Sequence, residues 1–264
     1  MTSPEFTGER LHDESELFGA DLARHRAAYE FAASWLDGAR VLDLGSGSGY
    51  GTAELPSAAA FVVGLDRVRP DAHGRASRAA FVRADLRRVP LASAHFDLVL
   101  SFQVIEHLDD PSEYLTEIAR VLRPGGVALI STPNRLTSDG VNPFHMHEYV
   151  ADELTECLAC HFGAVEMLGV GSSPAAARYL EARLLWIRRL MRIDPLGLHR
   201  RLPRSLVDGL FGRLAVLVRR VIRKSGEMDE LTTRDFPIGE SRPDDVDLIA
   251  VCRNPLHPGS DQSA

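Results

Sequence analysis

Four glycines at alternate positions follow a short apolar run that starts at Val41 and contains one carboxylate, Asp43. They are Gly45, Gly47, Gly49 and Gly51. An apolar run ending in glycines is typical of a buried strand that enters a tight turn, where glycine permits positive φ and close approach of a ligand. The residues from Thr52 onward suit a first helical turn, whose free N–H groups would point into the space that the glycines open. The pattern predicts a nucleotide-binding turn.

The spacing of these glycines does not fit the dinucleotide fingerprint G-x-G-x-x-G. Its sixth position would be Tyr50 in one register and Thr52 in the other. A second apolar run, 60–65, ends at Asp66. An acidic side chain at the end of the second strand can accept hydrogen bonds from both ribose hydroxyls of a nucleoside. Asp66 is therefore predicted to bind ribose, and the glycine spacing disfavours an oxidoreductase.

Two histidines could accept a proton from a substrate. His107 follows the fourth apolar run, and His145 lies in the segment 142–149 after the fifth. Both would lie on the rim formed by the carboxyl ends of parallel strands, where imidazole could serve as a general base. The alternative for His107 is a helix-start residue bonded to the backbone.

These segments together resemble the class I S-adenosylmethionine-dependent methyltransferases. The turn fits their D-x-G-x-G-x-G pattern, and FDLVLSFQVIEHL at 96–108, RVLRPGG at 120–126 and STPN at 131–134 follow in the family's order. The resemblance implies S-adenosyl-L-methionine as cofactor, with Asp85 bonded to the adenine amino group and Leu86 offering its backbone N–H. The cofactor-binding residues expected are Tyr29, Asp43, Gly45, Ser46, Gly47, Gly49, Asp66, Arg67, Asp85, Leu86, Ser101, Phe102 and Gln103.

Two segments resemble bacterial methyltransferases found among sugar and cell-envelope genes: 25–33 with the preceding 7–10, and NPFH at 142–145. The NPFH match favours His145 over His147, so the candidate catalytic residues are His145 and His107. Ala28 stands where those relatives carry an arginine before the tyrosine, and Tyr29 could instead only pack on the sheet. The resemblance implies a sugar or glycolipid hydroxyl as acceptor. The alternatives are a quinone or polyketide-like small molecule, methylated on O or N, and a cofactor-binding scaffold without catalysis.

Alternating short strands and helices predict an α/β fold with a doubly wound, mostly parallel sheet of seven strands and ligands at the strands' carboxyl ends. Helices are expected at 21–36, 111–122 and 151–161. Strands are expected at 41–44, 60–65, 81–86, 96–101, 127–131, 163–170 and 246–253. The resemblance implies that the last two strands pair as a hairpin at the sheet edge.

The predicted organisation is an N-terminal helical cap (1–38), a cofactor-binding domain (39–172 and 244–256), a basic helical insertion or lid (173–243) and a disordered tail (257–264). Residues 175–225 carry 13 basic and 3 acidic side chains, whereas the whole chain has a net charge of -7. Apolar residues at helical spacing in 180–191 and 206–221 predict two basic amphipathic helices. These could form a lid packed on the core, a peripheral contact with a membrane or a lipid-linked acceptor, or a homodimer contact.

Composition narrows the remaining functions. The negative net charge argues against nonspecific binding of nucleic acid. No basic, apolar leader starts the chain and no apolar run reaches about 20 residues, so we expect a cytoplasmic protein whose membrane association would come only from 175–225. The C-x-x-C-H string at 157–161 lies on a predicted helix, and its cysteines are expected to pack there without haem. A metal site built from His145, His147 and Glu148 is disfavoured because one short loop supplies few fixed ligands, so no metal is expected.

Overall fold

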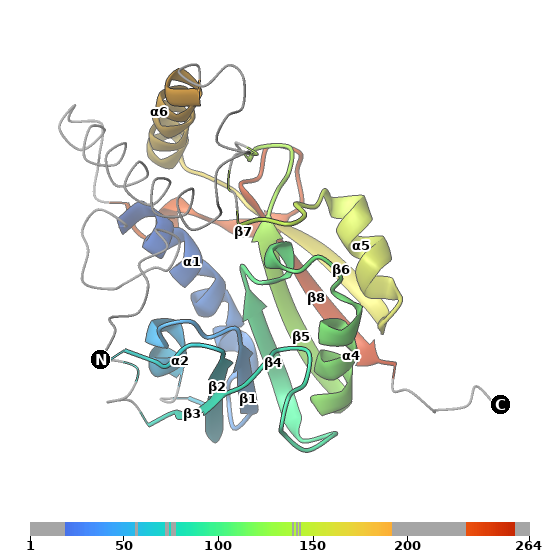
Figure 1. Ribbon diagram of the computed structural model, residues 1–264. Coiled ribbons are helices and arrows are strands. Elements are labelled where there is room, and N and C mark those ends of the chain that lie inside the picture. The colour runs from blue at the N-terminus through green and yellow to red at the C-terminus, as the bar shows by residue number, and fades with distance from the viewer. Residues whose placement is uncertain are drawn as a thin grey trace, which may run out of the picture.

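The computed structural model describes residues 19–55, 58–71, 74, 78–138, 140, 142, 144–191 and 231–256. A single eight-stranded sheet with the order β3-β2-β1-β4-β5-β8-β6-β7 forms its centre (Figure 1). The strands are β1 Arg40–Leu44, β2 Phe61–Asp66, β3 Ala80–Arg83, β4 Phe96–Phe102, β5 Leu122–Pro133, β6 Phe162–Val170, β7 Ile238–Glu240 and β8 Asp247–Pro255. The helices are α1 Gly19–Phe31, α2 Tyr50–Glu54, α4 Ser112–Val121, α5 Ala151–Ala159 and α6 Pro174–Met191, with short 3-10 turns η2 Ala32–Trp35, η4 Ile105–His107 and η6 Thr233–Asp235.

Strands β1 to β5 pair in parallel, whereas β8 runs antiparallel to β5 and β6. The chain leaves β1 toward β2 and β3 and returns to β4 on the other side of β1. The order of strands therefore reverses between β1 and β4, and ligands of open α/β sheets bind beyond the carboxyl ends of strands at such a point. The predicted doubly wound, mostly parallel fold and the β6–β8 hairpin pairing are confirmed.

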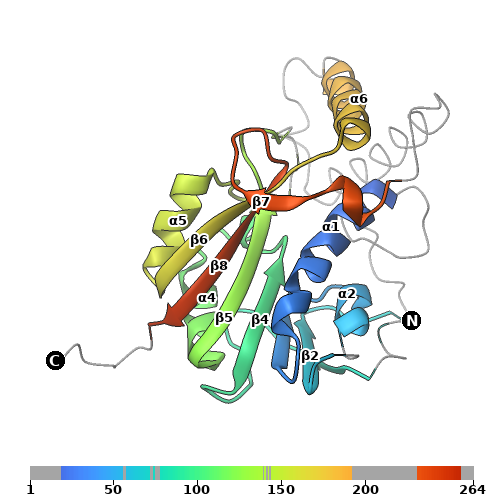
Figure 2. The same ribbon diagram turned by 180° about the vertical axis from the view of Figure 1, so that it is seen from behind.

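Helices cover both faces of the sheet (Figures 1 and 2). Tyr114 and Ile118 of α4 and Leu154 of α5 belong to the apolar core on one face. Tyr29 of α1 and Ala176 of α6 belong to the core on the other. The sheet is thus buried on both sides, which explains why its central strands are continuous apolar runs without a polar alternation.

Several predicted boundaries were wrong. The expected helix 21–36 ends at Phe31 and tightens into η2, and α2 begins at Tyr50, two residues before the expected start. β5 begins at Leu122, which pairs with Phe96, so the segment expected to be a turn before residue 127 is already extended. The sheet also has an eighth strand, β7, paired with β6 at the edge. The first expected basic helix corresponds to α6, and the second, at 206–221, lies outside the described residues.

Candidate functional site

The glycine turn after β1 is packed on one side and open on the other. Gly45, Gly47 and Gly49 have φ of +91°, +55° and +86°, a backbone region that other residues rarely adopt. A Cβ on Gly45 would lie 2.3 Å from Cγ2 of Val104, so glycine is required where the turn passes the loop after β4. No described residue lies within 4 Å of a Cβ built on Gly47. A ligand can therefore approach the backbone closely at Gly47.

Asp66, the last residue of β2, lies beside the open part of the turn. One carboxylate oxygen accepts the N–H of Gly47 at 2.9 Å, and the other accepts the N–H of Val68 at 2.8 Å. These bonds fix the orientation of the carboxylate, and each oxygen retains a lone pair for a further donor. Two neighbouring hydroxyls are suitable donors. The geometry at Gly47 and Asp66 therefore fits the ribose of a nucleoside.

Asp43 lies beneath the turn and supports it. Its carboxylate is 1% exposed and accepts hydrogen bonds from Thr52 Oγ1 at 2.5 Å and from the Tyr29 hydroxyl at 3.1 Å. Burial raises the pKa of Asp43 to about 6. A Cβ on Gly51 would lie 2.2 Å from the Tyr29 ring. Tyr29 thus packs α1 against the turn, and Asp43 bonds both Tyr29 and Thr52 of α2.

The predicted adenine contact, Asp85, is already engaged. Its carboxylate forms a bidentate ion pair with the guanidinium of Arg87, with N–O distances of 3.0 and 3.1 Å, and this pairing lowers the pKa of Asp85. An adenine amino group would have to share the carboxylate with the guanidinium. Leu86 beside it is half-buried, and the carbonyl of Arg67 accepts a hydrogen bond from Nε of Arg83 at 2.8 Å.

Other predicted cofactor residues have their side chains in the core. The Ser101 hydroxyl donates to the Leu44 carbonyl and accepts from the Tyr114 hydroxyl, both at 2.7 Å, so it joins three elements and offers a ligand only its backbone. Phe102 lies edge-on to the Tyr29 ring at 5.0 Å, and Ser46 is also buried. Gln103 is the least buried of the three residues 101–103 and has a left-handed φ of +56°.

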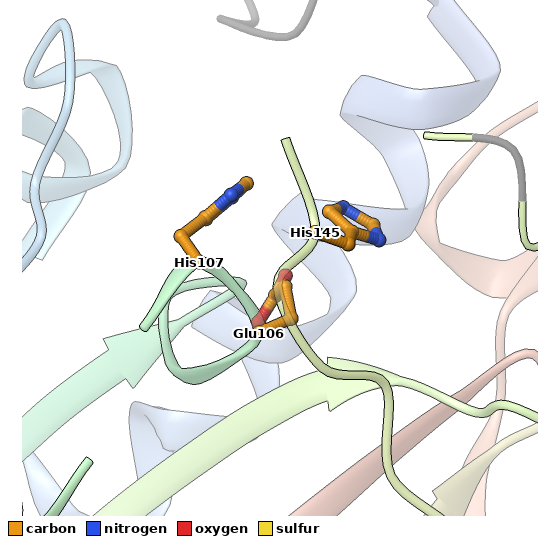
Figure 3. A group of neighbouring side chains, drawn as sticks. All are labelled: Glu106, His107 and His145. Atoms are coloured by element: carbon orange, nitrogen blue, oxygen red, sulfur yellow. The ribbon is translucent and has the colours of Figure 1, made fainter. Parts of the chain in front are cut away.

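Glu106, His107 and His145 meet at the rim of the sheet (Figure 3). One nitrogen or oxygen atom of each lies within 4.8 Å of the others. Glu106 is fully buried, which raises its pKa, and its Oε2 accepts a hydrogen bond from Thr132 at 3.1 Å. The exposed His107 donates from Nδ1 to the Phe144 carbonyl at 3.0 Å, which leaves the lone pair of Nε2 directed away from the backbone. The two histidines predicted to be catalytic are therefore neighbours, and the buried carboxylate of Glu106 lies beside them.

His145 is held at both ring nitrogens. Nδ1 donates to Glu148 at 2.6 Å, and Nε2 accepts the amide of Asn142 at 2.8 Å. Burial would raise the pKa of Glu148, but hydrogen bonds from His145 and Ser138 outweigh it and leave that pKa lowered. His147 instead bonds Glu153 of α5 at 2.9 Å. The disfavoured combination of His145, His147 and Glu148 is therefore not assembled, because His147 faces another element.

Sequence reasoning missed two residues that contact this region. His25 of α1 is half-buried with its Nδ1 bonded to the Tyr50 hydroxyl, and desolvation of the ring lowers its pKa to about 4. Phe81 of β3 lies against the turn, since a Cβ on Gly49 would be 2.8 Å from its ring. His25 stands inside a segment whose resemblance was noted, but nothing in its spacing indicated burial.

Comparisons with known proteins show the family of this chain. A family model described as a methyltransferase domain matches residues 42–130. A probable S-adenosylmethionine-dependent methyltransferase of Mycolicibacterium smegmatis is 42% identical over 192 residues, covering 67% of this chain and 72% of that protein. Another from Mycobacterium tuberculosis is 32% identical over 263 residues, covering 94% and 89%. The chain belongs to the S-adenosylmethionine-dependent methyltransferases.

The solved structures show that this methyltransferase has the family's class I fold. A methyltransferase from Thermotoga maritima superposes with a TM-score of 0.59 at 13% identity, covering 94% of this chain and 97% of that one. The cofactor is accordingly S-adenosylmethionine, and the open backbone at Gly47 beside Asp66 fits its ribose. No helix among the described residues is long and apolar enough to cross a bilayer.

Proposed function

We propose that this methyltransferase methylates a hydroxyl group of a sugar or glycolipid. When bound, S-adenosylmethionine supplies an electrophilic methyl group; the acceptor oxygen bonds that carbon as the sulfur–carbon bond breaks, giving S-adenosylhomocysteine, a methyl ether and one proton. The chain's own residues must hold the acceptor in line and take up the proton. The observation that carries the proposal is the available Nε2 of His107.

His107 has the geometry of a general base. The bond from its Nδ1–H to the Phe144 carbonyl fixes the neutral tautomer in which Nε2 is the acceptor. No described residue donates a hydrogen bond to that nitrogen, so an acceptor hydroxyl can do so. The carboxylate of the buried Glu106 lies beside the ring.

The polar character of the surrounding rim supports a polyhydroxylated acceptor. Asn142, His145 and Glu148 form one hydrogen-bonded group, and Ser138 extends it. Such groups can exchange their mutual bonds for bonds to sugar hydroxyls, whereas an apolar ring would offer them no bond in return. The NPFH resemblance at 142–145 points to the same acceptor class.

A phenolic hydroxyl is the second candidate. A ubiquinone biosynthesis O-methyltransferase of Rhizobium rhizogenes is 36% identical over 107 residues, covering 38% of this chain and 43% of that protein. The match supports methyl transfer to an oxygen atom. It does not distinguish a phenol from a sugar as the acceptor.

The test is a screen of sugars, glycolipids, quinols and amines with methyl-labelled S-adenosylmethionine, followed by kinetics of variants. In His107→Ala we expect turnover to fall at least about tenfold because the base is lost. We expect a similar fall in His145→Ala, which loosens the acceptor side of the rim. Both should bind S-adenosylhomocysteine normally.

His147→Ala is the matched control. The imidazole of His147 contacts Glu153 instead of the cluster, so we expect its removal to leave turnover unchanged. Labelling of amines alone would refute transfer to a hydroxyl. Tight binding of the cofactor without labelling of any acceptor would favour a cofactor-binding scaffold that has no catalytic activity.

A further inference from the structure

Three potential metal ligands meet at the rim of the sheet: Glu106, His107 and His145. A general base would require only one of them. One carboxylate and two imidazoles bind divalent transition metals such as Zn²⁺, with positions left open for substrate. The three side chains come from two segments, η4 and the loop after β5 (Figure 3). Those segments are joined by hydrogen bonds from the N–H groups of Met146 and His147 to the Glu106 carbonyl at 2.7 and 3.2 Å. The ligands are therefore fixed relative to one another.

Glu106 has an oxygen that the protein leaves without a donor. Its side chain is fully buried, Oε2 is bonded to Thr132, and Oε1 has no hydrogen-bond partner among the described residues. A buried, unpaired carboxylate oxygen is costly unless a positive charge or a donor meets it. A cation between this oxygen and the two imidazoles would satisfy it.

The contacts behind the two histidines are those of metal ligands. His107 donates Nδ1–H to the Phe144 carbonyl at 3.0 Å, and His145 donates Nδ1–H to the Glu148 carboxylate at 2.6 Å. Ligating histidines commonly donate their other ring N–H to a carbonyl or carboxylate, which orients the ring and makes the ligand nitrogen more basic. Because Nδ1 of each ring is a donor, Nε2 would be the ligand atom, and at His145 a metal would displace the amide of Asn142.

We propose that Glu106, His107 and His145 bind one divalent transition-metal ion of the Zn²⁺ type, which coordinates the acceptor oxygen in an open position. This role rests on the proposed function: the ion would make the bound hydroxyl more acidic, and its proton would pass to solvent. The ion would then replace His107 as the means of ionising the acceptor. His107 would serve as a ligand.

The experiment titrates chelator-treated, full-length protein with Co²⁺, followed by its visible spectrum, and with Mn²⁺, followed by calorimetry. We expect one equivalent to bind, without the thiolate charge-transfer band that Cys157, Cys160 or Cys252 would give. Glu106→Gln and His107→Ala should weaken binding at least about tenfold. His147→Ala should bind as the wild type does. Because Glu106 is buried, the exposed His107 provides the test if Glu106→Gln does not fold.

The proposal is overturned if the wild type binds no Co²⁺ or Mn²⁺, or if His107→Ala binds as tightly as the wild type. The two proposals can fail separately. Hydroxyl methylation by a protein that binds no metal overturns the metal site alone. Stoichiometric metal binding in a protein that methylates only amines retains the site and overturns the proposed function.

Discussion

The carboxylate of Asp66 holds the glycine turn, and we propose that it also binds the ribose of the cofactor. It accepts the N–H of Gly47, which holds the glycine turn, and it retains lone pairs for ribose. In Asp66→Ala we expect the affinity for S-adenosylhomocysteine, measured by calorimetry, to fall at least about tenfold, because hydrogen bonds to a charged group are lost and the turn is released. Asp152→Ala, an exposed change on α5, should bind normally. Unchanged affinity in Asp66→Ala would place the ribose elsewhere.

Single residues show what the sequence can and cannot predict. Asp66 was predictable because the end of an apolar run fixes where a strand stops, and the structure places its carboxylate beside the turn. Ser101 also ends such a run, yet its hydroxyl turns into the core toward Tyr114. Successive strand residues face opposite sides of a sheet, so a boundary that is uncertain by one residue leaves the direction of the side chain undetermined.

Among the helices, α1 is attached through contacts that the sequence pattern did not predict. Polar contacts attach it to the remainder of the molecule: Tyr29 to Asp43, Arg24 to Asp247 at 3.4 Å, and Asp21 to Arg183 of α6 at 2.8 Å. A periodic apolar pattern predicts which face of a helix is buried, but it contains no information about buried polar partners. His25, which bonds the Tyr50 hydroxyl, is part of the same attachment.

The attachment of α1 should depend on pH through His25. Burial lowers the pKa of His25 to about 4, whereas an unfolded histidine titrates near 6.5. Its stabilising contribution is therefore complete above about pH 6.5 and is lost as the pH falls toward 4, because the unfolded chain takes up the proton first. Between pH 7.5 and 5.0 the loss is about 2 kcal/mol in the free energy of unfolding.

Urea denaturation at these two pH values checks this prediction. We expect His25→Gln to lose about 2 kcal/mol less than the wild type over the same interval. Buried carboxyl groups with raised pKa, such as Asp43, change stability in the opposite direction, but they are present in both proteins and largely cancel in the difference. An equal loss in the two proteins would show that His25 is already protonated, or exposed, in the folded state.

For the whole molecule, the fold class followed from the alternation of apolar runs and helices, because a parallel sheet buried on both faces leaves a strong pattern. Strand β7 has no such sequence pattern, because its three residues, 238–240, are too few to alternate. They pair with β6 only because the chain returns past the edge of the sheet. The site was less predictable than the fold. Its cluster joins η4 to a loop some 40 residues later, and only the folded chain brings these together.

Charge is also distributed unevenly over the whole chain. Residues 175–225 have a net charge of +10 and the remainder has -17, although 192–225 lie outside the described residues. We propose that this segment binds anionic membrane surfaces, each basic residue near the surface contributing about 1 kcal/mol. Replacing Arg200, Arg201 and Arg204 with glutamine should therefore weaken cosedimentation with anionic vesicles at low salt at least about tenfold.

A control variant with the same change of charge outside residues 175–225 tests whether vesicle binding is specific to this segment. Glutamine at the exposed Arg88, Arg234 and Arg242 removes the same charge elsewhere and should leave vesicle binding nearly unchanged. Salt near 0.1 M, where the Debye length is about 10 Å, should weaken binding of the wild type. Equal losses in the two triple variants would mean that only net charge matters. Absence of wild-type binding at low salt would remove the membrane role, leaving a lid or a homodimer contact for the segment.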